Sequence, residues 1–352
     1  MKTPQLSVIV PVYNGARFLA PCLESLAASE LSGHECIVVD DGSTDDSVRV
    51  AGEHGATVVR LEQRGGPARA RNRGAETAQG DILVFLDADV CVHPDTLARV
   101  AAHFENDPAV GAVIGSYDDH PADPGFISQY KNLFHHYVHQ TSRSEAWTFW
   151  AGCGAIRREA FHALHGFDES YKRPCVEDIE LGSRLRAAGY RIDLNRAIQV
   201  THLKRWTFWS LLRTDVFDRG VPWFRLMLRT RTMPPDLNVT IAHRLSVALV
   251  FALLLLSGGM AAAQLTAFRH APAITVLAPL ALLAIAGLLF RLNADLYRFF
   301  RRQRGLLFAA RAVPLHWLYY VYCGAAVLLG AAMHVWDQRP TRRHAWNLAA
   351  RG

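Results

Sequence analysis

Two aspartates follow an apolar run in a pattern that can bind a divalent cation. Asp87 and Asp89 come directly after the run Ile82–Leu86. An uninterrupted run of this length is typical of a strand buried on both faces, and open parallel sheets bind ligands at the carboxyl ends of such strands. Two carboxylates one residue apart on an extended segment can share Mg²⁺ or Mn²⁺, which in turn holds phosphates. The alternative is an ordinary acidic turn, and this motif alone does not decide.

A second group of acids begins a predicted helix. Glu177, Asp178 and Glu180 stand in its first turn, while Leu181 and Leu185 fall on one apolar face. The positive end of the helix dipole tolerates acids at this position, so capping alone also explains them.

Short β-branched runs that alternate with helical segments predict an α/β fold for the amino-terminal part. The predicted strands are residues 6–12, 36–39, 57–61 and 82–86, and helices follow at 17–28, after a Thr44 cap, and from about Pro67. Such alternation gives a parallel, right-handed wound sheet whose strand ends share one edge. Residues 115–147 show a weaker pattern and are predicted to be a loop, either a mobile acceptor-side segment or a surface insertion.

Five short motifs, taken in order, resemble the signature set of family 2 glycosyltransferases. They are residues 7–14 (SVIVPVYN), 38–45 (VVDDGSTD), 70–74 (ARNRG), 86–89 (LDAD) and 177–178 (ED). Each is weak alone, but the order is specific, and the resemblance covers roughly residues 5–210. It implies an inverting enzyme with the GT-A fold, which has a Rossmann-like, mostly parallel sheet and binds a nucleotide-diphospho-sugar donor.

The resemblance also implies roles for the strand-end residues. Asp41 would accept hydrogen bonds from the base or ribose, unless it only caps the following turn. Arg71 would approach the donor phosphates, unless it is a surface arginine. Asp87 would contact the sugar or ribose, and Asp89 would ligate Mg²⁺ or Mn²⁺ on the diphosphate, where the ion stabilises the leaving group. The full donor-binding set is Pro11, Tyr13, Asn14, Asp41, Arg71 and Asp87.

Inversion needs a single general base, and Asp178 matches the family's catalytic position. Glu177 and Glu180 are the neighbouring alternatives. Further on, residues 202–206 (HLKRW) end like the Q-x-x-R-W motif of processive polysaccharide synthases, but His202 stands in the Gln position. We expect His202 to be a metal ligand or a packed histidine.

Glu177 and three residues beside this histidine are secondary candidates for phosphate or acceptor binding. The three residues are Lys204, Arg205 and Trp206.

The chain has 352 residues and a net charge of +6. Its amino-acid composition changes near Arg244. Beyond it the chain is rich in Leu and Ala, and arginines flank apolar runs, which indicates a membrane surface and not nucleic acid. The six cysteines form no C-x-x-C pair and are expected to be reduced thiols. The amino terminus does not resemble a signal peptide, so the catalytic part is expected in the cytoplasm.

Three apolar segments, residues 245–268, 271–290 and 312–336, are predicted membrane spans. The arginine-rich segment 291–311 is predicted to be a cytoplasmic loop. Three spans place the basic tail outside, so either the third segment is re-entrant or the positive-inside rule is overridden. Aromatic residues and arginines at 206–231 indicate segments that lie at a membrane interface.

The sequence therefore predicts four parts. They are a cytoplasmic GT-A domain at 1–205, amphipathic interfacial segments at 206–243, a transmembrane region at 244–338 and a basic tail at 339–352. We expect an integral protein of the cell (inner) membrane that moves a sugar to a membrane lipid or lipid-linked acceptor. The alternatives are a processive polysaccharide synthase and a non-catalytic nucleotide-binding membrane subunit. A nucleotidyltransferase would usually show a Gly-rich phosphate loop, which residues 13–15 do not form.

Overall fold

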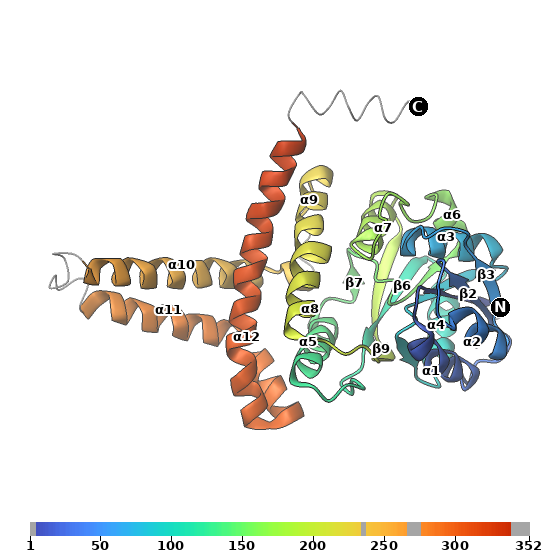
Figure 1. The fold of residues 1–352 in the computed structure, drawn as a ribbon, viewed down its shortest axis with the longest axis horizontal. Helices are drawn as coiled ribbons and strands as arrows, with labels where there is room; N and C mark the ends of the chain where they lie inside the picture. Colours follow the sequence, from blue (N-terminus) through green and yellow to red (C-terminus); the bar gives the residue numbers. More distant parts are fainter. Residues whose placement is uncertain (1–4, 234–236, 266–275, 339–352) are drawn as a thin grey trace. The chain divides into compact units, whose positions relative to one another are not determined.

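The chain forms two compact units that divide between Leu211 and Leu212 in the computed structural model (Figure 1). The structure describes residues 5–233, 237–265 and 276–338. The predicted basic tail, and the parts of two predicted spans at 266–268 and 271–275, lie outside these residues.

The first unit begins with four parallel strands in the order β3-β2-β1-β4. These strands are β1 (Leu6–Val12), β2 (Glu35–Asp40), β3 (Thr57–Arg60) and β4 (Ile82–Leu86), and they are joined by α1 (Ala16–Ala27), α2 (Ser47–Glu53) and α3 (Pro67–Thr77). Every residue of β4 is buried, as its apolar sequence predicts. α1 turns Leu19, Cys22, Leu23 and Leu26 into the core at helical spacing.

Beyond β4 the sheet becomes mixed. β8 pairs antiparallel with both β4 and β6, β6 pairs parallel with β9, and β5 pairs antiparallel with the end of β9. The strands are β5 (Val90–Val92), β6 (Val110–Tyr117), β7 (Glu145–Ala146), β8 (Cys153–Arg157) and β9 (Arg191–His202), and the helices are α4 (Thr96–Asn106), α5 (Phe126–Thr141), α6 (Arg158–Ala163) and α7 (Glu177–Ala187). The α/β prediction is confirmed, although only the amino-terminal half of the sheet is uniformly parallel.

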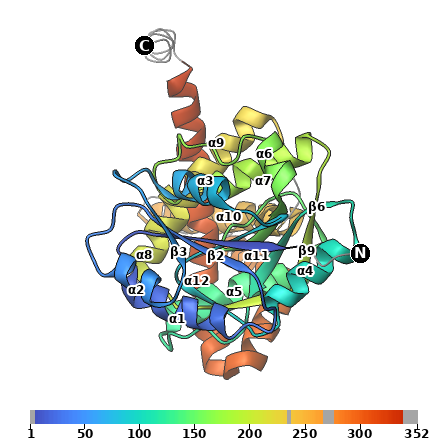
Figure 2. The ribbon, with the colours of Figure 1, turned by 90° about the vertical axis from the view of Figure 1, so that its right-hand side faces the viewer.

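Helices cover both faces of this sheet, as an α/β fold requires. α3, α6 and α7 lie over one face, and α1, α2 and α4 lie over the other (Figure 2). The sheet's apolar residues are consequently sealed between two helical layers, and only its edges reach solvent.

Two local predictions were wrong. Residues 115–147 are not a loop throughout, because α5 occupies Phe126–Thr141. Its buried face includes Ser128, Asn132 and His136, and these polar residues hid the helical period. Thr44 does not cap α2, which begins at Ser47; its backbone N–H instead donates to Oδ1 of Asn14 at 2.8 Å.

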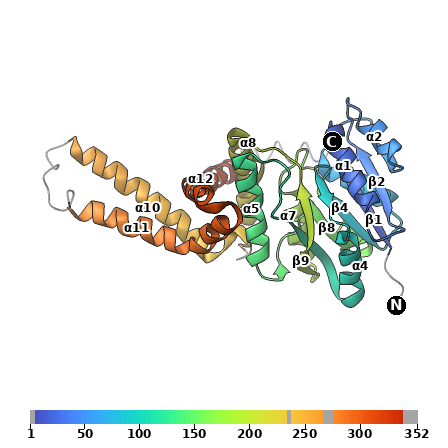
Figure 3. The ribbon, with the colours of Figure 1, turned by 90° about the horizontal axis from the view of Figure 1, so that it is seen from below.

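The second unit is helical. After α8 (Phe208–Arg213), which crosses the division, it contains the π-helix η1 (Thr214–Gly220), α9 (Val221–Thr230), the 3₁₀ turn η2 (Leu237–Val239), α10 (Ile241–Gln264), α11 (Ala278–Leu292) and α12 (Ala294–Asp337). α10 and α11 lie side by side (Figures 1 and 3). By length and composition α10 and α12 are apolar enough to cross a membrane, while α11 is a shorter apolar helix.

The arginine-rich segment 291–311 is helical, where a loop was predicted. It forms the end of α11 and the first part of α12, which is interrupted at Gly305 with φ 85° and ψ 175°. The positive φ explains glycine at this break, because a side chain is strained there. The residues that follow, Leu306 and Leu307, are exposed by 72% and 75%.

Candidate active site

The ends of the strands bring the predicted metal ligands together. β5 runs antiparallel to the end of β9, with Val90 opposite His202. Asp89 therefore lies beside His202, and its carbonyl oxygen accepts a hydrogen bond of 2.8 Å from the N–H of Leu203. The Nε2 atom of His202 lies 3.7 Å from Oδ2 of Asp89, and the histidine side chain is 4% exposed.

Two further residues hold the His202 ring. Oδ1 of Asn132, on α5, lies 2.8 Å from its Nδ1. The ring of Tyr117 stacks on the imidazole with a centroid distance of 4.5 Å and an angle of 17°. Neither residue was predicted from the sequence, since Asn132 lies in the segment expected to be a loop and Tyr117 belongs to no motif.

Arg71 links the end of β4 to the start of α7. Its Nη2 donates to Asp87 at 2.8 Å and its Nη1 donates to Glu177 at 2.9 Å. Glu177 also accepts from the backbone N–H of Cys175 at 2.8 Å. Both Arg71 and Glu177 are buried, so Arg71 is not the surface arginine of the alternative interpretation.

Asp178 stands at the same end of α7 in a different environment. Its Oδ2 accepts from the backbone N–H of Ala151 at 3.1 Å, and its Oδ1 accepts from Ile179 at 2.8 Å. The adjoining Gly152 carbonyl accepts from the N–H of Asp87 at 3.4 Å. Asp178 and Asp87 are therefore hydrogen-bonded to neighbouring residues, Ala151 and Gly152, of one turn.

The acids around Asp178 bind arginines. Both carboxylate oxygens of Glu180 accept from Arg184, at 2.7 Å each, and Glu177 is held by Arg71. Asp178 accepts hydrogen bonds from two backbone amides, and its charge also acts on the nearby guanidinium of Arg71.

The predicted nucleotide side is built from β1 and β2. Asp41 is buried and accepts from the N–H groups of Gly65 and Gly66, at 2.7 and 2.8 Å. Asp40, not Asp41, caps the following turn through a 2.9 Å bond from the N–H of Ser43. Asp41 thus clamps the segment before α3, and each of its oxygens retains a second lone pair for a ligand.

The remaining donor candidates line the end of β1. Asn14 adopts a left-handed conformation with φ 49°, and its side chain and backbone bind Thr44 and Ser43. The guanidinium of Arg64 lies 3.9 Å from the Tyr13 ring, and Pro11, partly buried, pairs with Val39. Tyr13 is 41% exposed, so one ring face can meet a base.

One of the two basic residues after β9 lies against a buried tryptophan. Lys204 lies with its Nζ 4.3 Å from the Trp206 ring centroid, and Arg205 is exposed. The backbone N–H of Trp206 donates to Oγ of Ser128 at 2.8 Å. Within the described residues, the buried Nε1 of Trp206 makes no hydrogen bond.

The two aspartates that follow β4, Asp87 and Asp89, differ in acidity. Burial raises the pKa of Asp87, Arg71 opposes this and Asp89 adds to it, so the net direction is upward. Burial also raises the pKa of Asp89, but His202 and Lys204 outweigh it and the net direction is downward.

The donor set fits a Mg²⁺ or Mn²⁺ ion that is shared with a substrate. No group of three or more His, Cys, Asp or Glu side chains that could hold a metal occurs among the described residues. Asp89 and His202 would contribute one oxygen and one nitrogen, a combination that Mn²⁺ accepts. The remaining positions would have to come from substrate phosphates and water, as is usual for such ions.

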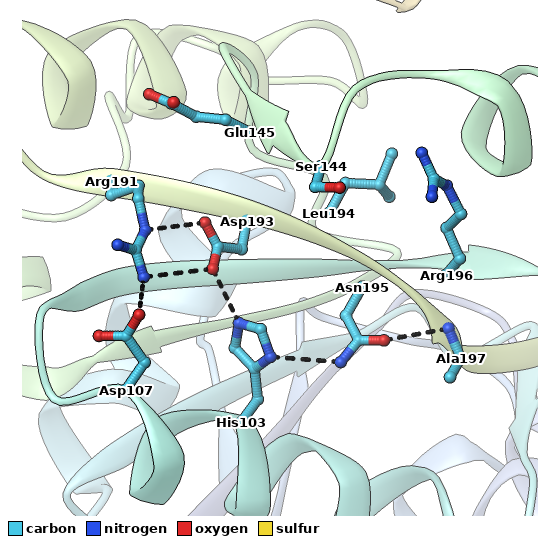
Figure 4. Close-up of a pocket in the computed structure, with 10 residues that line it drawn as sticks. All are labelled: His103, Asp107, Ser144, Glu145, Arg191, Asp193, Leu194, Asn195, Arg196 and Ala197. Carbon is cyan, nitrogen blue, oxygen red and sulfur yellow. Dashed lines mark hydrogen bonds and ion pairs between the residues drawn. The ribbon is translucent and has the colours of Figure 1, made fainter.

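A hollow of about 620 Å³ lies elsewhere on the first unit, at the start of β9. None of the predicted site residues lines it. Several of its charged side chains pair with one another: Arg191 binds Asp107 and Asp193, and Asp193 lies 3.1 Å from His103 (Figure 4). This network ties α4 to β9, and we assign it a structural role.

Comparison with known proteins identifies the first unit. Residues 7–164 match the glycosyl transferase family 2 model, and residues 132–205 match that of the N-terminal domain of galactosyltransferase. The chain carries a family 2 glycosyltransferase domain. The resemblance drawn from the five motifs is thereby confirmed.

Curated relatives of this glycosyltransferase domain match over about a third of the chain. The uncharacterized glycosyltransferase YibD of Escherichia coli K12 is 40% identical over 114 residues, which are 30% of this chain and 33% of that protein. A PGL/p-HBAD biosynthesis glycosyltransferase of Mycobacterium bovis BCG is 37% identical over 126 residues, 32% of this chain and 48% of that protein. The chain thus spans between a third and a half of the length of these relatives.

Solved structures confirm the GT-A fold of the glycosyltransferase domain. A mannosyltransferase from Pyrobaculum calidifontis, in complex with GDP-Man and Mn²⁺, has a TM-score of 0.57 at 20% identity and covers 96% of this chain and 89% of that chain. GalNAc-T7 with UDP, GalNAc and Mn²⁺ has a TM-score of 0.50 at 17% identity and covers 64% of this chain and 48% of that chain.

Proposed function

We propose that this chain is a membrane-anchored inverting glycosyltransferase that moves a sugar from a nucleoside-diphosphate donor to a membrane lipid or lipid-linked acceptor. The observation that carries the proposal is the meeting of Asp87, Asp89, His202 and Asp178 at one sheet edge of a family 2 domain. The GDP-Man bound by the mannosyltransferase and the UDP bound by GalNAc-T7 support a nucleotide-sugar donor.

In the proposed reaction the chain's residues divide the work. The strand ends of β1 and β2 bind the nucleoside, with Tyr13 beside the base and Asp41 beside the ribose or base. Asp89 and His202 hold a divalent cation, which stabilises negative charge on the departing diphosphate when it is bound. Arg71 keeps Asp87 in place for the sugar or ribose.

Asp178 takes the proton from the attacking acceptor hydroxyl. The hydroxyl oxygen forms the new glycosidic bond while the bond from the anomeric carbon to the diphosphate oxygen breaks. The proton ends on Asp178, and a single displacement of this kind inverts the anomeric configuration. The backbone hydrogen bonds to Asp178 fix its orientation for this step.

The helical unit supports the membrane part of the proposal. α10 exposes Leu254 and Leu255 by 51% and 75%, and α11 exposes Leu283 by 70%. Apolar surface of this extent is costly in water and favourable in lipid. The relative named for PGL/p-HBAD biosynthesis is compatible with a lipid-linked acceptor. Extraction of cell membranes with alkaline carbonate should leave the full chain in the pellet; its release would contradict a spanning anchor.

The deciding experiment measures donor turnover by the purified full chain in detergent. A panel of nucleotide sugars is tested with Mn²⁺, with Mg²⁺ and with chelator, for the native chain and Asp89→Ala. Asp95→Ala is a matched control, because that carboxylate is partly exposed and forms its ion pair with Arg99, four residues along the chain. We expect one donor to release its nucleoside diphosphate in a manner that requires the metal and Asp89.

Other outcomes would redirect the assignment. A folded protein that binds nucleotide but turns over none of the donors would indicate a non-catalytic nucleotide-binding subunit. A product ladder of many added sugars would indicate a processive synthase, which the His202 substitution in the Q-x-x-R-W-like segment disfavours.

A further inference from the structure

We infer that Asn132 is a positioning residue that sets the tautomer of His202 so that its Nε2 can bind the divalent cation. This inference rests on the proposed metal-assisted transfer and extends it to a residue outside the sequence motifs. Asn132 lies on α5, with 1% of its surface exposed, and its Oδ1 is 2.8 Å from Nδ1 of His202.

The hydrogen-bond chemistry gives a direction to this contact. A carbonyl oxygen only accepts, so Nδ1 of His202 carries the hydrogen and Nε2 of the neutral ring carries a lone pair. That lone pair belongs to the nitrogen that lies 3.7 Å from Oδ2 of Asp89. Two acceptors then face each other in a buried place, an arrangement that a bound cation stabilises.

The distance between the two atoms supports the same conclusion. A hydrogen bond from Nε2 to the carboxylate would bring nitrogen and oxygen to about 2.7–3.2 Å. At 3.7 Å the pair is too far apart for that bond, while each atom can still reach one cation between them at the usual ligand distance of about 2.0–2.2 Å. If the amide of Asn132 were reversed, its nitrogen would donate to Nδ1 of His202, and the hydrogen of the neutral ring would lie on Nε2. Nε2 would then have to donate to Asp89, which the distance does not allow.

The surroundings prevent the ring from turning away. Tyr117 stacks on the imidazole at 4.5 Å, and His202 is 3% exposed. With its plane fixed by Tyr117 and its Nδ1 engaged by Asn132, the imidazole presents only Nε2 to Asp89. Outer partners of this kind typically change metal affinity by about 10–100-fold when they are removed.

The test measures Mn²⁺ alone, by electron paramagnetic resonance titration of the full chain in detergent. Asn132→Leu should weaken Mn²⁺ binding by about 10–100-fold and remove the imidazole-nitrogen modulation from the spin-echo spectrum. Asn132→Asp keeps the shape and accepts the same hydrogen bond, so it should bind Mn²⁺ at least as tightly and retain that modulation. Leu133→Ala, a buried apolar neighbour on α5, controls for general destabilisation and should leave both signals unchanged.

The possible outcomes separate this inference from the proposed function. If His202→Ala loses Mn²⁺ affinity but Asn132→Leu does not, the positioning role is wrong and the metal site stands. If neither His202→Ala nor Asp89→Ala changes the affinity, the proposed metal site itself is wrong. Should Asn132→Leu fail to fold, loss of the nitrogen modulation in Asn132→Asp would by itself overturn the inference.

Discussion

The guanidinium of Arg71 forms a buried ion pair with Glu177, with 2.9 Å between Nη1 and Oε1 and both side chains 6% exposed. The pair joins α3 to the start of α7, and through Nη2 of Arg71 it also reaches Asp87. Glu177 is therefore better placed to hold the site together than to act as the base.

Glu177→Ala should lower the free energy of unfolding by about 3 kcal/mol, because it leaves a buried arginine with one partner fewer. The comparison is Glu76→Ala, which removes a half-exposed pair with Arg73 and should cost at most about 1 kcal/mol. Denaturant unfolding followed by tryptophan fluorescence measures both. Equal losses in the two variants would show that the Arg71 pair is not a special support.

Asp178→Asn should lower sugar transfer by about 10²–10⁴-fold while donor binding persists, because the amide keeps the shape of the carboxylate and can accept one of its two backbone hydrogen bonds, but it cannot take a proton. Glu180→Gln is the matched control on the same helix, and transfer should remain near the native rate. Initial rates and nucleotide-sugar titrations on the same preparations provide the two readouts. Near-normal transfer by Asp178→Asn would refute the assignment of the base.

His93 should make stability depend on pH. The hydrogen bond to Asp118, at 2.9 Å, raises the pKa of His93 above its ordinary value, although burial opposes it. A raised pKa means that the stabilisation is fully present below about pH 6.5 and is lost as the pH rises through the folded-state value. The melting-temperature gap between the native chain and His93→Gln should therefore narrow between about pH 6 and 8.5. A gap that stays constant over this range would contradict the pairing.

Gly66 should tolerate alanine less well than Gly55 does. Both have positive φ, 88° and 71°, so both variants strain the backbone by about 1 kcal/mol or more. Only at Gly66 would the new Cβ also meet backbone, since it would lie 2.5 Å from the carbonyl oxygen of Lys172, whereas nothing lies within 4 Å at Gly55. Thermal unfolding should show the larger loss for Gly66→Ala, and equal losses would show that the loop before α3 adjusts freely.

A large part of the fold and of the candidate site could be predicted from short segments of the sequence. The apolar run of β4, the turn residues after β1 and β2 and the helix-start acids of α7 are all properties of short segments, so the sequence predicts them directly. The long apolar helices α10 and α12 follow from composition for the same reason. The family resemblance rests on these segments, and the comparisons confirm it.

The tertiary structure decided how these segments act on one another. Only the pairing of β5 with β9 places Asp89 beside His202, and only the packing of α5 adds Asn132. The sequence likewise could not show that Asp41 holds the Gly65 and Gly66 amides. Such contacts join residues far apart in the chain, and their geometry depends on how whole strands and helices pack, which no local pattern of residues encodes.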